Sequence, residues 1–396
     1  MKKPHGCYAV CWSSDLNLKR IRFFSARGLC TGVLICLLAS ACAPTTQRVR
    51  IDNQATQAEA RKQREVALQA YMDDQRRLMR VSYPLLTKGS DLCGDDIRYT
   101  TGLALANSST LLGEDFRESA QNTYQLTDEV KAVYVIPGSA ADKAGIRSGD
   151  TIRYIGDWSL PAGQNAVRQS LEQLQLQTQT GKAVRLDVVR NGKGQSLLIT
   201  PDKSCAYPVV LGDGDEVNAY ADGKQVVIQR GMMRFASNDT ELALVISHEI
   251  AHNSMSHVRS KMTNYALGTV VDLAAQILLG IPTQGLFGKL AGNAYSQGFE
   301  SEADYVGLYI MAQSGGDIDT APQFWRRMAT LSPNAIKSSH LASHPATPER
   351  FVALEETVKE IKAKKAAGKP LVPNLKNAPE PEPDPSNVLE KSKASP

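Results

Sequence analysis

The chain has 396 residues, of which 42% are hydrophobic and 22% charged, so it is long enough for two or three domains with a sizeable core. This composition excludes a collagen-like, coiled-coil or mostly disordered protein. The formal net charge is +4, but the residues before Cys42 contribute +5 from six basic residues and one acidic residue, which leaves the remainder at −1. Neither this balance nor any recognition motif points to a nucleic-acid partner, and we expect none.

Residues 1–41 have the layout of a secretory signal peptide, in which a basic region precedes an apolar run, Leu29–Ala41, that is too short for a transmembrane helix. The sequence Leu-Ala-Ser-Ala before Cys42 resembles a bacterial lipobox, which implies that Cys42 carries lipid. Ala43 follows, rather than the Asp typical of inner-membrane retention. We therefore expect a periplasmic protein anchored to the membrane by lipid, at the inner face of the outer membrane. An ordinary signal peptide with an incidental cysteine is the alternative.

Residues 42–92 are predicted to form a linker and then one long helix. Apolar residues recur at helical spacing from about Gln54 to Leu86, and Pro84 is expected to interrupt the helix. Beyond Cys42 only Cys93 and Cys205 remain, and a cysteine pair in an oxidising compartment tends to form a disulfide. Because the two cysteines flank a region of different character, we expect a disulfide at the neck of an inserted domain; two separate buried thiols are the alternative.

Residues 93–205 alternate β-branched and aromatic runs with turn signals, which predicts a mostly β domain. Asn191-Gly192 is a tight hairpin signal. A short helix, Ala140–Ala144, should be ended by Gly145, and a second helix is expected over about 164–175.

Within this region "VYVIPGSAADKAGIRSGDTIRYIGD" resembles a PDZ domain of the type found in bacterial periplasmic proteases. The resemblance implies that the loop containing Gly102 and Leu103 binds C-terminal peptides, which add as a strand to the sheet edge. A β domain that only spaces or stabilises its neighbours is the alternative.

Residues 206–362 contain the sequence His248-Glu249-Ile-Ala-His252 in an apolar stretch that is predicted to be a buried helix capped by Asn238 or Asp239. Histidines four residues apart share a helix face and can both bind one metal ion. Glu249, one residue on, is placed to act as a general base toward a water molecule. Two ordinary surface histidines are the alternative. After Lys362 the chain is rich in Pro, Lys and Glu, so residues 363–396 are predicted to be a disordered tail.

A catalytic zinc needs a third protein ligand. His257 lies five residues after His252 rather than the six of the metzincin pattern, so that pattern fails. Downstream, Glu300 and Asp304 are four residues apart in "SQGFESEADYVGLYIMAQSGGD". Glu300 can complete the ligand set and Asp304 can orient a ligand imidazole. A solvated acidic helix start is the alternative.

These motifs together resemble metallopeptidase family forty-eight, the gluzincins that include HtpX and the CAAX prenyl proteases. The segments "DEVNAYADGKQVVIQRGMM" and "HLASHPATPERF" match the family as well. The resemblance implies one Zn²⁺ per chain, bound by His248, His252 and Glu300, with Glu249 as the base. It also implies a substrate strand beside Asn218 and Ala219, and it places His344 near the site, where it would stabilise an oxyanion or occupy the open metal position. A loop histidine is the alternative for His344. We expect His257 to be structural or to support a ligand, and Arg350 to pair with an acidic group near the cleft.

The expected fold is α+β: a mainly helical zincin-type domain with a small sheet and an inserted, mostly β PDZ domain. The expected function is zinc-dependent endoproteolysis of unfolded or misassembled envelope proteins. A non-catalytic zinc-binding chaperone or adaptor that binds C-termini is the second hypothesis. A CAAX-type protease is a third, and it needs a membrane-spanning chamber. Residues 264–292 are predicted to be a helix or hairpin over the cleft, acting as a lid or a surface for unfolded protein, with a membrane-dipping segment as the alternative.

Overall fold

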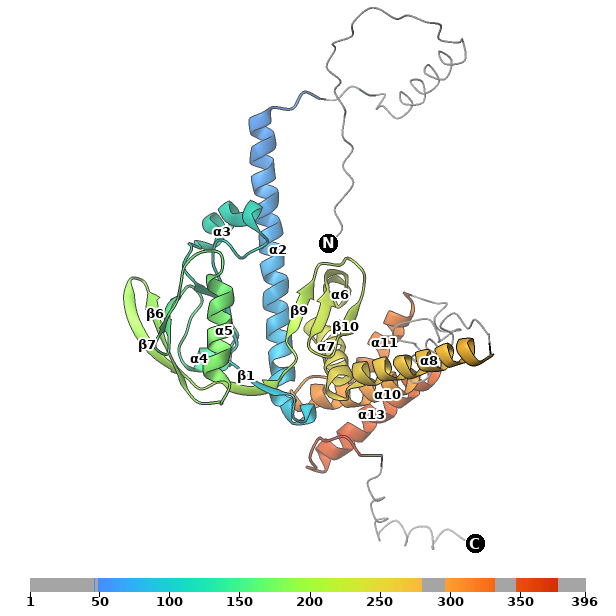
Figure 1. The fold of residues 1–396 in the computed structure, drawn as a ribbon. Helices are drawn as coiled ribbons and strands as arrows, with labels where there is room; N and C mark the ends of the chain where they lie inside the picture. The colour runs from blue at the N-terminus through green and yellow to red at the C-terminus, as the bar shows by residue number, and fades with distance from the viewer. Residues whose placement is uncertain (1–45, 47–48, 280–295, 332–346, 377–396) are drawn as a thin grey trace, which may run out of the picture. The chain divides into compact units, whose positions relative to one another are not determined.

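The computed structural model describes residues 46, 49–279, 296–331 and 347–376 (Figure 1). The chain divides into two compact units, residues 1–59 and 60–396. The predictions for the leader, Cys42, His344 and the end of the tail lie outside the described residues. Within the described part of the chain, no helix combines the length and the apolar character needed to cross a membrane.

Helix α2 (Asn53–Lys88) continues through Pro84, so the predicted break there is wrong. A proline inside a helix removes one hydrogen bond and costs about 3 kcal/mol. Two other features stabilise the helix around Pro84. The next residue, Leu85, is buried in a hydrophobic core. The Thr87 hydroxyl donates a hydrogen bond to the Tyr83 carbonyl oxygen at 2.8 Å. Tertiary packing therefore outweighs the helix-breaking tendency of proline at this position.

A β-rich domain follows α2 and is joined to the rest of the chain by a two-stranded antiparallel neck, β1 (Ile97–Thr100) and β8 (Asp202–Cys205). A 3-10 helix, η1 (Ser90–Cys93), precedes the neck. The main sheet has the strand order β2-β3-β4-β6-β7, with β5 paired to β4. Its strands are β2 (Leu103–Ala106), β3 (Lys131–Val135), β4 (Thr151–Ile155), β5 (Trp158–Ser159), β6 (Val184–Arg190) and β7 (Lys193–Ile199). The helical elements are η2 (Glu114–Phe116), α3 (Arg117–Tyr124), α4 (Ala140–Lys143) and α5 (Ala166–Thr178).

Turn residues place these elements as predicted. Asn191 and Gly192 both have positive φ, at 51° and 75°, and they connect β6 to β7 in a hairpin. The short helix α4 begins after Ser139, whose side chain accepts a hydrogen bond from the Asp142 backbone N–H, and Gly145 follows it with a φ of 87°. The domain has its own hydrophobic core, separate from that of the helical domain.

The helical domain contains a three-stranded sheet with the strand order β10-β11-β9, and the sheet shares one hydrophobic core with the helices. The strands are β9 (Val209–Gly212), β10 (Ala219–Ala221) and β11 (Val226–Gln229). The helices are α6 (Arg230–Phe235), α7 (Asp239–Ser254), α8 (His257–Leu279), α10 (Ser296–Gln313), α11 (Ala321–Ala329) and α13 (Pro348–Ala366). The predicted 264–292 segment is therefore helical as far as Leu279, and its remainder lies outside the described residues.

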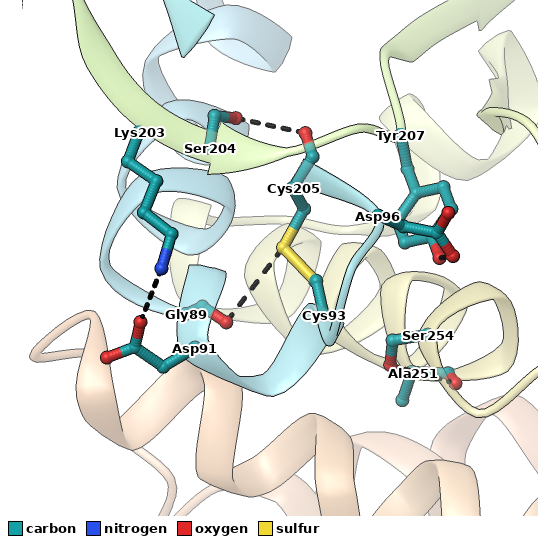
Figure 2. The surroundings of a disulfide bond; sticks show 10 residues. All are labelled: Gly89, Asp91, Cys93, Asp96, Lys203, Ser204, Cys205, Tyr207, Ala251 and Ser254. Carbon is teal, nitrogen blue, oxygen red and sulfur yellow. Dashed lines mark hydrogen bonds and ion pairs between the residues drawn. A yellow bond between two sulfur atoms is a disulfide. The ribbon is translucent and has the colours of Figure 1, made fainter. Parts of the chain in front are cut away.

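The disulfide between Cys93 and Cys205 closes the neck of the inserted domain (Figure 2). Its sulfur atoms are 2.01 Å apart, and the two residues are separated by 112 positions in the sequence. Both cysteines are buried and belong to the same hydrophobic cluster as Ala251 of α7. The covalent link is therefore part of the core of the helical domain.

The boundary of the C-terminal tail differs from the prediction. Helix α13 continues to Ala366, beyond the predicted start of the tail at residue 363, and the chain after it is described as far as Lys376. Gln313 donates a hydrogen bond to the Leu371 carbonyl oxygen at 2.7 Å, and the Asn374 backbone N–H donates one to the Tyr305 hydroxyl at 2.9 Å. These contacts with α10 order a segment whose composition predicted disorder.

We expect Arg77→Ala to lower the free energy of unfolding by about 2 kcal/mol, because one guanidinium joins α2 to the start of α7. Arg77 donates to the Asp239 carboxylate and to three carbonyl oxygens at 2.7–2.9 Å, those of Met233, Ala236 and Asn238. The neighbouring Arg80 is half-exposed and pairs with Asp239 without the carbonyl contacts that Arg77 makes, so Arg80→Ala should cost below about 1 kcal/mol. Urea unfolding of both variants measures the difference in the free energy of unfolding. Equal decreases in the two variants would contradict the prediction that Arg77 is the more important link.

Candidate metal centre

Helix α7 carries the His-Glu-x-x-His sequence in the interior of the protein. Of the two predicted caps, the structure selects Asn238, whose side chain accepts a hydrogen bond from the Glu241 backbone N–H at 2.9 Å. His248, Glu249 and His252 are exposed by only 2%, 3% and 8%. The alternative of two ordinary surface histidines is therefore wrong. Burying imidazoles and carboxylates costs free energy unless hydrogen-bonding or charged partners surround them. We therefore expect such partners next to these three side chains.

Helix α10 supplies such partners by packing closely on α7. Gly307 makes the close approach possible, because a Cβ atom there would lie 3.1 Å from the His248 backbone. The packing brings Glu300 to the two histidines. His248 Nε2 lies 3.1 Å from His252 Nε2 and 3.4 Å from a Glu300 oxygen, and His252 Nε2 lies 3.3 Å from the other Glu300 oxygen.

The spacing of these three donor groups fits a tetrahedral zinc ion. Zinc bonds to imidazole nitrogen and carboxylate oxygen are about 2.0–2.2 Å long, so tetrahedral ligands lie about 3.3–3.6 Å from one another. The observed separations of His248, His252 and Glu300 are close to this range, and their candidate donor atoms all lie within 4.8 Å of one another. Three protein ligands leave one position of a tetrahedron open, as in catalytic zinc sites.

The electrostatics of the cluster also favour a cation. Burial lowers the pKa of His248, but hydrogen bonds and charge from Asp304 and Glu300 outweigh it and raise the pKa to about 10. The carboxylates thus stabilise positive charge at His248. A metal ion at the site would supply such a charge in place of the proton.

Asp304 contacts His248 on the side of its ring that faces away from His252, and Arg350 in turn contacts Asp304. Asp304 Oδ1 is 3.0 Å from His248 Nδ1, the ring nitrogen that faces away from His252. The guanidinium of Arg350 donates to both Asp304 oxygens, at 2.8 and 2.9 Å, and lies 3.1 Å from Glu300. Burial lowers the pKa of Arg350, but Asp304 and Glu300 more than offset this and raise it. The predicted pairing of Arg350 with an acidic group is therefore present. Burial raises the pKa of Asp304, but the charges and hydrogen bonds of Arg350 and His248 outweigh it and hold that pKa below its ordinary value.

His257 lies behind the second histidine rather than among the three donor groups. Its Nδ1 is 3.1 Å from His252 Nδ1 and its Nε2 is 2.9 Å from Glu302. The ring stacks on Phe299 at 4.6 Å between centroids. Burial lowers the pKa of His257 below its ordinary value, which favours a neutral ring. This placement fits a supporting role for His257.

The other predicted site residues are distributed over two domains. Asn218 directly precedes β10, an outer strand of the described three-stranded sheet, and Ala219 begins that strand, which packs near α7. Gly102 lies in the β-rich domain with a φ of 71°, and Leu103 begins β2, an outer strand of the described sheet there. His344 and Cys42 lie outside the described residues.

Three residues around the metal centre were missed by reasoning from the sequence: Phe299, Glu302 and Trp325. The Trp325 ring of α11 lies 5.0 Å from the His248 ring and also contacts the Arg350 guanidinium. No spacing rule connects α11 to α7, so the sequence offered no signal for it. Glu302 is two residues from Glu300, which places it on another face of α10, and only its long side chain reaches His257.

Two histidines four residues apart on a buried helix, together with a glutamate from a second helix, could hold a metal ion, and this is the arrangement of ligands found in zincin-type metallopeptidases. Residues 197–358 match the family model described as peptidase family M48. The chain thus contains a peptidase family M48 domain, in an α+β fold with an inserted β domain.

Curated relatives share this part of the chain. The beta-barrel assembly-enhancing protease of Yersinia pestis is 31% identical over 167 residues, which are 38% of this chain and 34% of that protein. The protein of that name from Escherichia coli strain K12 is 28% identical, over 36% of this chain and 32% of its own length. The mitochondrial metalloendopeptidase OMA1 of Schizosaccharomyces pombe is 32% identical, over 36% and 44%. The match spans about a third of the length of the first two relatives.

Among solved structures, an HtrA3 PDZ domain bound to a phage-derived ligand aligns with 27% of this chain and 88% of that chain. The identity is 16% and the TM-score is 0.21. A serine endoprotease from Yersinia pestis aligns with 28% of this chain and 30% of its own, at 20% identity and a TM-score of 0.19. Identities and TM-scores this low support no conclusion about ligands.

Proposed function

We propose that this protein is a zinc-dependent metalloendopeptidase of the bacterial cell envelope that hydrolyses unfolded or misassembled proteins. The observation that carries the proposal is the cluster of His248, His252 and Glu300 at tetrahedral spacing, with Glu249 buried on the same helix. A Zn²⁺ ion bound there would supply a Lewis acid that polarises a peptide carbonyl and activates water.

The chain's own residues account for the rest of the chemistry. Glu249 accepts a proton from the attacking water and delivers it to the departing amine, which is the work of a general base and then a general acid. Asp304 and Arg350 fix the orientation of His248 through the contacts at 2.8–3.0 Å described above. The outer strand β10, beginning at Ala219, offers backbone groups to an extended substrate, which adds as a further strand.

We assign the selection of substrates to the inserted domain. We propose that it is a PDZ domain and that the loop at Gly102 and Leu103 captures exposed C-termini of envelope proteins. The supporting observations are the positive φ of Gly102 and the position of β2 as an outer strand of the described sheet. Lipid on Cys42 would hold the enzyme at the inner face of the outer membrane. The Yersinia and Escherichia relatives are named beta-barrel assembly-enhancing proteases, which agrees with action on envelope proteins.

Removal of the metal is expected to abolish cleavage of an unfolded envelope protein. Dialysis against a strong chelator should reduce product formation at least about a hundredfold, and one equivalent of Zn²⁺ should restore it, because the polarising charge is lost and regained. Gel-based cleavage assays with unfolded and folded forms of one substrate measure both effects. Undiminished cleavage after verified zinc removal would contradict the proposal.

The second candidate function is a non-catalytic zinc-binding chaperone or adaptor. Burial of Glu249 beside the donor cluster disfavours it, because a scaffold has no need of a buried carboxylate at that position. In the same assay, a zinc-loaded protein that suppresses aggregation of the unfolded substrate without forming any product would favour the chaperone.

A further inference from the structure

The two ligand histidines are supported in different ways. His248 is held directly by a buried carboxylate, Asp304, whose side chain is 4% exposed. His252 is held by another histidine: its Nδ1 lies 3.1 Å from Nδ1 of His257, and Nε2 of His257 lies 2.9 Å from Glu302. The side chain of Glu302 is 53% exposed. The support of His252 therefore runs through a second ring to a carboxylate at the protein surface.

The chemistry of imidazole fixes the direction of these hydrogen bonds. His252 presents Nε2 to Glu300 and His248, so a zinc ion would be held by Nε2, which would place the ring proton on Nδ1. That proton is donated to Nδ1 of His257, which must be the proton-free nitrogen of its ring. His257 then carries its proton on Nε2 and donates it to a Glu302 oxygen.

We propose that Glu302 is a positioning residue for the zinc ligand His252, and that it acts through His257. Glu302 accepts the Nε2 proton of His257 and so keeps Nδ1 of that ring available as an acceptor. Phe299 stacks on the ring at 4.6 Å and fixes its plane. Loss of the acceptor at Glu302 allows the other tautomer of His257, whose Nδ1–H opposes the Nδ1–H of His252. The inference rests on the proposed zinc site and does not depend on peptide hydrolysis.

The test is the zinc dissociation constant, measured by competition with a chromogenic chelator on the full-length protein. Because a partner behind a ligand histidine changes metal affinity by about 10–100-fold, we expect Glu302→Ala to weaken zinc binding about tenfold. Glu302→Gln keeps an oxygen acceptor and should stay within about threefold of wild type. The control is Glu356→Ala, which removes an exposed glutamate of α13 paired with Lys359 and should leave affinity unchanged. Equal losses in the Gln and Ala variants would overturn the assignment.

A double-mutant cycle shows whether Glu302 acts through His257. His257→Phe preserves the stack on Phe299 and removes both hydrogen bonds, so adding Glu302→Ala to it should cause no further loss of affinity. Losses that multiply would overturn the proposal. Nitrogen-15 spectra of the histidine rings provide a readout that a general structural effect would not move. His257 should be the Nε2–H tautomer in wild type and Glu302→Gln, and a mixture in Glu302→Ala; an unchanged tautomer in the Ala variant would overturn the proposal.

A failure of this inference is distinguishable from a failure of the proposed function. Normal zinc affinity and an unchanged His257 tautomer in Glu302→Ala would reject the positioning role while leaving cleavage intact. Absence of cleavage by a protein that binds zinc through His252 would reject the enzyme and leave the positioning role untouched.

Discussion

Glu249→Gln is expected to lower the turnover of an unfolded substrate about a thousandfold while zinc remains bound, within the range that loss of a general base produces. The amide has nearly the shape of the carboxylate but cannot accept the proton of the attacking water. The three donor groups, His248, His252 and Glu300, are unchanged in this variant, so the zinc content should equal that of wild type. Initial rates at saturating substrate, together with metal analysis of the same samples, measure both quantities.

The matched control is Glu241→Gln on the same helix. Glu241 pairs with Arg327 at 2.6 Å and accepts hydrogen bonds from Ser237, so its loss should reduce stability with little effect on turnover below the unfolding transition. A Glu249→Gln protein that cleaves at the wild-type rate would show that another group is the base. The inactive variant should also retain substrate long enough for crosslinking, which would identify the cleaved proteins.

The sequence predicted those parts of the site that depend on local spacing. Residues four apart share a helix face whatever surrounds the helix, so the sequence alone pairs His248 with His252 and Glu300 with Asp304. That the two pairs meet depends on how α7 and α10 pack, and only the family resemblance supplied that information. In the structure, Gly307 permits the close approach of the two helices.

Contacts that depend on side-chain length or on tertiary packing were not predictable in this way. Glu302 is on the wrong face of α10 by helical periodicity and reaches His257 only because its side chain is long and the ring stands behind His252. Trp325 meets His248 across two helices with no fixed spacing between them. Packing also reversed the expectations for Pro84 and for the chain after residue 363, where buried neighbours and hydrogen bonds outweigh local propensity and composition.

Turns were predicted well where backbone conformation restricts the choice of residue. Gly145 and Gly192 adopt positive φ, which few other residues tolerate, so the end of α4 and the β6–β7 hairpin follow from the sequence. The order of the strands in the sheet of the inserted domain carries no such local signal. The disulfide at the neck was nevertheless predictable, because Cys93 and Cys205 flank a region whose sequence character differs from that of its neighbours.

Replacement of both cysteines, Cys93→Ser with Cys205→Ser, is expected to destabilise the helical domain by about 4 kcal/mol. Removing a native disulfide typically costs about 2–5 kcal/mol, and the cost grows with the length of the closed loop, here a sequence separation of 112. The two sulfur atoms are also buried in the core that includes Ala251 of α7 (Figure 2). Two hydroxyl groups in their place would add the cost of burying polar atoms.

The inserted domain should be affected much less, because its hydrophobic core is separate. The protein's own tryptophans distinguish the two: Trp158 is in β5 of the inserted domain and Trp325 is in α11. The third tryptophan, Trp12, is replaced by Phe in both backgrounds. With Trp158→Phe added, fluorescence during urea unfolding follows the helical domain, and with Trp325→Phe added it follows the inserted one. We expect the cysteine replacements to shift the first transition strongly and the second weakly. Equal shifts would mean that the two domains unfold together and that the disulfide stabilises them as one unit.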